Sequence, residues 1–147
     1  MRKDVLFPLV LLIAVLVAGC GPSPTPTAPA APPALSVQGK VSRPLALSLE
    51  QIKALGLEKM TLEHPKNGPT EYEGVRLNQV LDQAAPAAEA TTLVFTAADG
   101  FSAEVPLADV RACAECLVAI SGTTLNLAMP GLPGKAWVRT VIGIEVK

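Results

Sequence analysis

Hydrophobic and polar residues alternate along several short stretches of the chain, the pattern expected of β-strands that bury one face. Asp99 and Gly100 stand between two of these stretches, and this dipeptide suits a tight hairpin turn that needs positive φ. A second turn is predicted at 65–69, where two prolines enclose an Asn-Gly pair. The stretches are residues 35–41, 57–64, 70–75, 91–97, 101–107, 116–121, 123–129 and 136–146.

Hydrophobic residues recur at helical spacing in two other places, 48–55 and 76–85. Ser48 and Gln51 have the spacing of a capping box at the start of the first segment. The second segment ends before Pro86 and is predicted to bury one face. The residues on that face are Leu77, Val80, Leu81 and Ala84.

A third short helix is predicted at 110–115, with Asp109 as its N-cap. Strands and helices together predict one α+β domain with mixed sheets and short helices over residues 35–147. This length suits a single domain with one core. The repeated alternation excludes a purely helical bundle.

The N-terminus has the pattern of a secretory signal. Arg2 and Lys3 precede an uncharged apolar run at 5–18, which is too short for a membrane-spanning helix. The run ends in "LVAGC", which resembles the lipobox of bacterial lipoproteins. That resemblance implies a signal peptide at 1–19 and a lipid on Cys20 that anchors the protein on the extracytoplasmic side of a membrane. An uncleaved anchor, or an ordinary signal with an incidental cysteine, is the alternative.

Residues 20–34 follow as a Pro-rich tether. Six prolines and no charge or large apolar side chain occur in 21–34. This composition favours an extended polyproline II spacer at about 3.1 Å per residue. A Pro-rich ligand for a partner domain is the alternative, but no basic residue lies beside the prolines.

The charge of the chain gives no sign of a nucleic-acid partner. The chain has 12 basic and 13 acidic residues, and the signal segment holds two and one of them. The remainder is therefore nearly neutral, with no block of five like charges. Neither nucleic acid nor an anionic membrane surface is electrostatically favoured.

Cys113 and Cys116 form a CxxC pair, for which several chemistries are open. A local disulfide is favoured in an oxidising compartment, and two small buried thiols are the next reading. A thiol redox centre of the thioredoxin type would need a helix N-terminus beside the thiolate. Structural zinc would need four ligands, and c-type haem would need a histidine where Leu117 stands.

Three segments in order resemble the molybdopterin-binding domain of the sulfite oxidase family. They are "YEGVRLNQVLDQA" at 72–84, "TAADGFSAEVPL" at 96–107 and "LNLAMPGLPGKAWVRTVIGIEV" at 125–146. The resemblance implies a mixed α+β fold that holds a pterin-bound molybdenum for oxygen-atom transfer or a related two-electron reduction. It also implies that the turn residues Asp99, Gly100 and Phe101 line the cofactor cleft.

The family's metal also takes a protein thiolate, expected near "MTLEHPKN" at 60–67. This chain has Glu63 and His64 there but no cysteine, and neither group substitutes simply for a soft thiolate. Molybdopterin binding therefore rests on the resemblance alone. The basic residues that could hold the cofactor's phosphate are Lys66, Arg76, Lys135 and Arg139.

The first hypothesis is a lipid-anchored accessory module that binds a small ligand or an extracytoplasmic protein. A molybdopterin-dependent oxidoreductase with atypical ligation, or a thiol redox protein that uses the CxxC pair, is the alternative. The remaining polar candidates have plainer explanations. His64 is expected to be a surface or capping residue, Glu71 and Glu73 a solvated strand face, and Trp137 a core residue.

Overall fold

The structure is a computed structural model that describes residues 32–147. The predicted signal peptide, Cys20 and the tether up to residue 31 lie outside the described residues. Within this part of the chain, no helix is long and apolar enough to cross a membrane.

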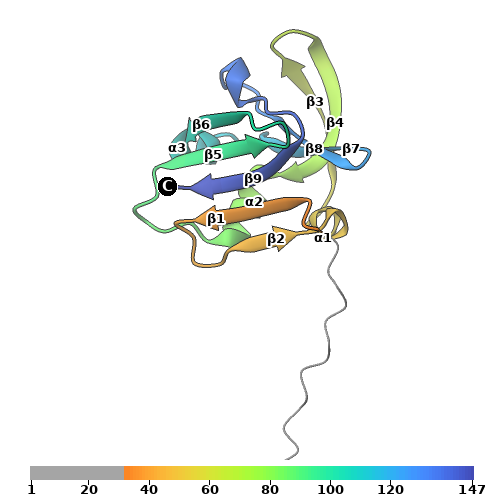
Figure 1. Ribbon diagram of the computed structural model, residues 1–147. Coiled ribbons are helices and arrows are strands. Elements are labelled where there is room, and N and C mark those ends of the chain that lie inside the picture. The colour runs from red at the N-terminus through yellow and green to blue at the C-terminus, as the bar shows by residue number, and fades with distance from the viewer. Residues whose placement is uncertain (1–31) are drawn as a thin grey trace, which may run out of the picture.

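Two β-sheets and three short α-helices make up an α+β domain, which confirms the predicted fold class (Figure 1). The first sheet has the strand order β2-β1-β9-β5-β6, and the second has the order β3-β4-β7-β8. The strands are β1 (Leu35–Gly39), β2 (Leu45–Leu47), β3 (Glu58–His64), β4 (Gly68–Arg76), β5 (Thr92–Ala97), β6 (Ser102–Pro106), β7 (Leu117–Ser121), β8 (Thr124–Ala128) and β9 (Val141–Val146). The helices are α1 (Leu49–Ala54), α2 (Leu77–Ala84), α3 (Leu107–Ala112) and the 3-10 turn η1 (Gly134–Ala136).

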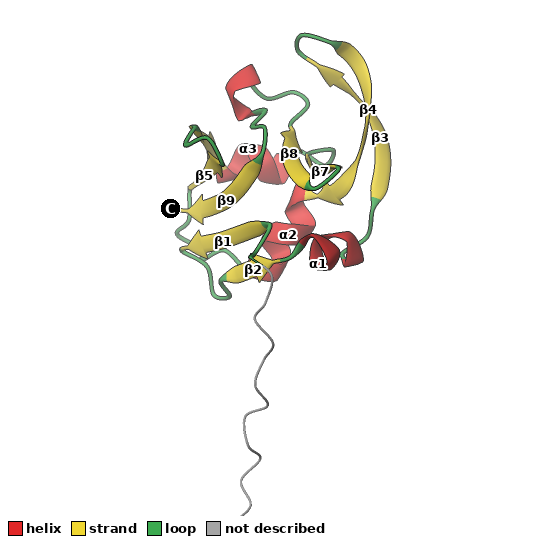
Figure 2. Ribbon diagram, turned by 45° about the vertical axis from the view of Figure 1, so that its right-hand side comes forward, coloured by secondary structure: helices red, strands yellow, loops and turns green. Residues whose placement is uncertain are grey.

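The helices α2 and α3 lie between the two sheets, where their apolar faces close the core (Figure 2). All four predicted face residues of α2 are buried. They pack with Leu35, Leu93 and Phe95 from the five-stranded sheet and with Val75 and Val118 from the four-stranded one. The amphipathic pattern of α2 is thus explained by two sheets packing around one helix.

Capping signals were predicted at the start of the first and third helices, and the structure confirms one of them. The capping box is confirmed: Gln51 N donates to Ser48 Oγ over 3.3 Å, and Ser48 N donates to Gln51 Oε1 over 2.8 Å. The third helix was placed wrongly. α3 begins three residues earlier than predicted, so Asp109 lies in its first turn and Pro106 takes the N-cap position.

The last strand also differs from its prediction. Residues 136–140 leave the sheet, and only Val141–Val146 pair with β5 and β1. Thr140 adopts a positive φ of 50°, and its amide donates to Asn126 Oδ1 over 2.9 Å. The segment before β9 is therefore a loop fixed against β8, with Ala136 and Val138 buried in the core.

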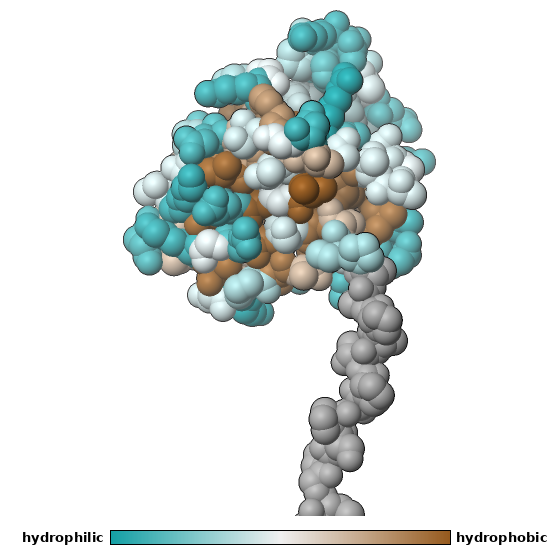
Figure 3. Space-filling model, in the orientation of Figure 1, coloured by the Kyte–Doolittle hydropathy of each residue, from teal (hydrophilic) through white to brown (hydrophobic). Residues whose placement is uncertain are grey.

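The β3–β4 hairpin extends beyond the rest of its sheet. β3 and β4 pair over seven residue pairs, whereas β4 pairs with β7 only at Gly74–Arg76. The hairpin therefore projects beyond β7, with its hydrophilic tip at the top of the view in Figure 3. Its inner face still packs on the domain, because Leu62 is buried against residues of β7 and β8. The turn predicted at its tip is confirmed at residues 65–67.

Candidate functional site

A pocket of about 320 Å³ lies between the hairpin and the loop that precedes β9. A second pocket of about 280 Å³ adjoins it and shares His64, Trp137 and Arg139. We call these two pockets the aromatic cleft. Besides the shared residues, its lining consists of Asn67, Tyr72, Asn126, Leu127, Pro65, Lys66 and Gly134.

His64 ends β3 and caps the turn that follows, as predicted for a capping residue. Its Nδ1 accepts hydrogen bonds from the amides of Lys66 over 3.1 Å and Asn67 over 3.2 Å. Its ring meets Trp137 edge-on, with the ring centroids 4.8 Å apart and the planes at 71°. Because Nδ1 is used as an acceptor, Nε2 carries the proton of the neutral ring and remains a donor.

Trp137 was expected in the core, and this expectation is only partly correct. The side chain is half-buried: it packs against the core but also lines the aromatic cleft. Its Nε1 atom is buried and has no hydrogen-bond partner within the described part of the chain. A buried donor without an acceptor costs about 1–3 kcal/mol.

The loop between η1 and β9 positions two of the cleft residues. Trp137 and Arg139 sit in this loop, and the amide of Leu127 donates to the Val138 carbonyl over 2.8 Å. Two residues further on, the Thr140 amide donates to Asn126 Oδ1. The loop is therefore attached to β8 on both sides of Arg139, which sets the guanidinium at the cleft.

The lining of the aromatic cleft is cationic. Lys66 and Arg139 line it, and no acidic side chain is among the lining residues that the structure describes. Residues of the hairpin alternate between its two faces, so Glu63, Glu71 and Glu73 point away from the cleft and are exposed. The predicted solvated face of Glu71 and Glu73 is thus confirmed.

The two other basic residues considered for phosphate binding do not line the cleft. Arg76 bonds Glu58 through Nε and Nη2, each over 2.8 Å, and Nη1 donates to the Ala114 carbonyl over 3.2 Å. Lys135 lies exposed on η1. Arg76 thus serves to join the hairpin base to the loop before β7.

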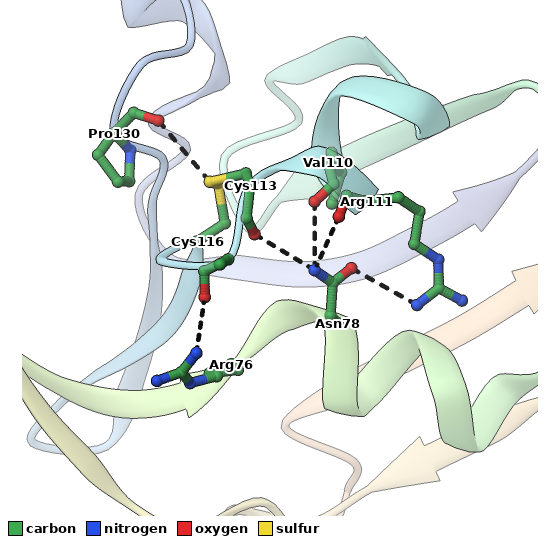
Figure 4. The surroundings of a disulfide bond; sticks show 8 residues. Arg76, Asn78, Val110, Arg111, Cys113, Cys116 and Pro130 are labelled. Carbon is green, nitrogen blue, oxygen red and sulfur yellow. Dashed lines mark hydrogen bonds between the residues drawn. A yellow bond between two sulfur atoms is a disulfide. The ribbon is translucent and has the colours of Figure 1, made fainter.

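Cys113 and Cys116 form a disulfide at the exit of α3, with their Cα atoms 5.5 Å apart (Figure 4). Cys116 is 1% exposed, whereas Cys113 is half-buried beside a separate pocket. Cys113 follows the C-terminal end of a helix. This is the opposite of the thioredoxin arrangement, in which a helix N-terminus stabilises the thiolate.

Asp99, Gly100 and Phe101 form the tip of the β5–β6 hairpin. Gly100 has a φ of 87°, and Asp99 Oδ1 accepts a hydrogen bond from the Phe101 amide over 2.9 Å. The predicted turn is therefore present. None of the three residues lines the aromatic cleft, and their role beside a cofactor stays a prediction.

Sequence reasoning missed Tyr72, Asn67 and Asn126 as lining residues. Tyr72 occupies an inward position of β4 that the strand alternation already predicts, so periodicity held a usable signal. The asparagines come from a turn and from another strand. Only the tertiary packing of the hairpin against the loop brings them together.

The family model "Oxidoreductase molybdopterin binding domain" matches residues 23–147. Among solved structures, the fold is similar to the sulfane dehydrogenase SoxCD from Paracoccus pantotrophus, with a TM-score of 0.65 and 19% sequence identity. The match covers 76% of this chain and 37% of that one, so this chain spans well under half of the SoxCD chain. A search of curated proteins gave no match.

Proposed function

This chain belongs to the family of oxidoreductase molybdopterin-binding domains, and from that premise we propose that it is a lipid-anchored, extracytoplasmic binding module. The aromatic cleft is its binding site, and the occupant is a small ligand rather than a metal centre that turns over substrate. The lipobox-like "LVAGC" and the Pro-rich tether support the anchoring.

The donor set of the cleft is the observation that carries this proposal. The segment in which the resemblance predicts a metal thiolate forms the end of β3 and its turn, and it contributes His64 and Asn67 to the cleft. The lining residues of the cleft offer a metal only nitrogen and oxygen ligands. The two cysteines of the described residues are bonded to each other. These residues do not fit a molybdenum centre held by a soft thiolate.

The cleft instead fits a ligand that accepts hydrogen bonds and carries a flat or apolar part. Trp137 and Tyr72 supply aromatic surface to the lining, with their ring centroids 6.0 Å apart. Lys66 and Arg139 add positive charge to the lining. An organic anion would use the aromatic faces and the cations together.

Metal and pterin analysis tests the proposal directly. The full chain would be purified from a host that makes the molybdenum cofactor, followed by metal quantification and detection of the pterin by its fluorescence. We expect both well below one per chain. Stoichiometric molybdenum and pterin would overturn the proposal and favour an oxidoreductase with atypical ligation.

Trp137 is the single tryptophan of the chain, so its fluorescence reports on the cleft. We expect benzoate, a small aromatic carboxylate, to change the emission in a saturable way. Arg139→Gln should weaken this binding roughly tenfold, the effect of losing one charge-assisted hydrogen bond. Arg43→Gln, at an exposed position away from the cleft, is the matched control and should leave it unchanged.

A further inference from the structure

The projecting hairpin has two strand edges that no neighbouring strand covers completely. β3 is the terminal strand of its sheet along its whole length, and β4 is free of β7 over residues 68–73. Within residues 32–147, β4 is the sole backbone partner of Glu58–His64. Free strand edges of this length are templates for pairing with another strand.

The free edge of β4 is unsuited to pairing. Pro69 lacks an amide donor there, and prolines are a common means of blocking a strand edge. Glu71 and Glu73 follow on its exposed face and would meet like charges in a second copy. Any strand that joins the hairpin therefore has only the β3 edge available.

The sequence of β3, "EKMTLEH", is complementary to itself when a second copy runs antiparallel about Thr61. On the exposed face, Lys59 of each copy then lies opposite Glu63 of the other, and the two Thr61 side chains face each other. On the opposite face, Met60 lies opposite Leu62, and Glu58 lies opposite His64. Cross-strand pairs of opposite charge and of apolar side chains are those that stabilise antiparallel sheets.

We propose that two copies of this chain pair along β3 and join their four-stranded sheets into one sheet of eight strands. The two-fold axis passes through Thr61 at right angles to the sheet. This operation keeps both aromatic clefts on the same face of the joined sheet. Lys59 contributes through a side chain that is 64% exposed and whose partner within one copy, Glu73, is 3.6 Å away.

A cysteine at the symmetry centre tests the pairing. Opposed residues in antiparallel strands have Cα atoms about 4.5–5.5 Å apart, which suits a disulfide. Thr61→Cys in the full chain should therefore give a disulfide-linked dimer on a non-reducing gel. Glu71→Cys is the matched control, because Glu71 lies beside Thr61 on the same exposed face but on β4. A monomeric Thr61→Cys chain, or equal cross-linking of both variants, would overturn the proposal.

Charge reversal provides a second test by sedimentation of the full chain in detergent. Lys59→Glu and Glu63→Lys each replace two opposite-charge pairs with like-charge pairs, and each should weaken self-association about tenfold. A mixture of the two variants restores opposite charges at both positions, so it should associate as tightly as the unmodified chain. Failure of the mixture to recover would reject pairing in this register. Neither test depends on ligand binding, so the pairing along β3 can be rejected while the proposed function stands.

Discussion

A single amide, that of Asn78, organises the loop that carries the disulfide. Its Nδ2 donates to the carbonyls of Val110, Arg111 and Cys113 over 3.2–3.5 Å, at the end of α3. The last carbonyls of a helix lack partners within the helix. Asn78 on α2 supplies the missing hydrogen-bond donor to these carbonyls. The disulfide closes the turn that follows the same helix end (Figure 4).

Removal of the disulfide should cost stability without loss of the fold. Cys113→Ser with Cys116→Ala opens a loop with a sequence separation of 3, for which chain entropy gives a loss of about 2 kcal/mol in the free energy of unfolding. Urea denaturation measures this change, with the reduced native chain as control. The pair should also have a reduction potential below about −300 mV. A markedly higher value would instead favour a thiol redox protein.

For single residues, the sequence predicts capping and turn roles correctly, but it does not predict which side chains pack in the core. The capping role of His64 follows from a strand end next to Pro65, and the turn role of Asp99 follows from the Gly that succeeds it. The core position expected for Trp137 is only partly correct, because the strand predicted through it is a loop until residue 140. A large aromatic side chain faces the core or a cleft according to where the backbone leaves the sheet. No local sequence pattern predicts that point.

At the scale of elements, the crossing of β4 and β7 depends on Gly74. A Cβ at this position would overlap the Val118 carbonyl oxygen and lie 2.6 Å from the Ala119 Cα. Both atoms belong to the backbone and cannot rotate away. The close approach of the two strands at the base of the hairpin therefore requires a residue without a side chain.

Gly74→Ala should consequently destabilise the protein by about 3 kcal/mol or more, within the range of severe single substitutions. Gly143→Ala is the control, since a Cβ there meets nothing closer than Ser36 Oγ at 3.5 Å, and its cost should stay below about 1 kcal/mol. The midpoints of chemical denaturation compare the two. Equal losses would show that the β4–β7 contact is not the cause.

Element types were largely predictable, because most of the strands and two of the helices bury one face. β2, three residues long, was missed because so short a segment has no measurable period. α3 was placed too late because Asp109 looked like a cap, whereas Pro106 occupies that position with no side-chain hydrogen bond. The predicted start of this helix was thus wrong because its N-cap residue makes no side-chain hydrogen bond.

At the scale of the whole molecule, the two ends of the domain meet in parallel pairing. Val37 of β1 lies opposite Ile144 of β9, a contact across most of the chain. Strand order of this kind is invisible in periodicity, which reports the face of a strand and not its neighbour. The family resemblance implied a mixed α+β fold, which the structure confirms, but the parallel pairing of the two ends was not predicted.

The proposed anchor gives a prediction at the same scale. Cys20→Ala removes the thiol that would carry the lipid, and stable anchoring needs about two buried acyl chains. We expect metabolic labelling with a radioactive fatty acid to mark the unmodified chain but not Cys20→Ala. Ser23→Ala in the tether should be labelled like the unmodified chain. Labelling of Cys20→Ala would contradict Cys20 as the lipidated residue.

Because the ladder between β4 and β7 is short, side-chain packing holds much of the hairpin in place. Three residue pairs hold its base, and the free length beyond them carries His64 and Tyr72 on one wall of the cleft. Leu62, on the same face of the hairpin as these two residues, is buried against Leu117 and Ala119 of β7, whereas the opposite wall is tied to β8 by hydrogen bonds. The two walls of the cleft are thus held by different forces, so a smaller side chain at position 62 should loosen the hairpin wall and leave the wall on β8 in place.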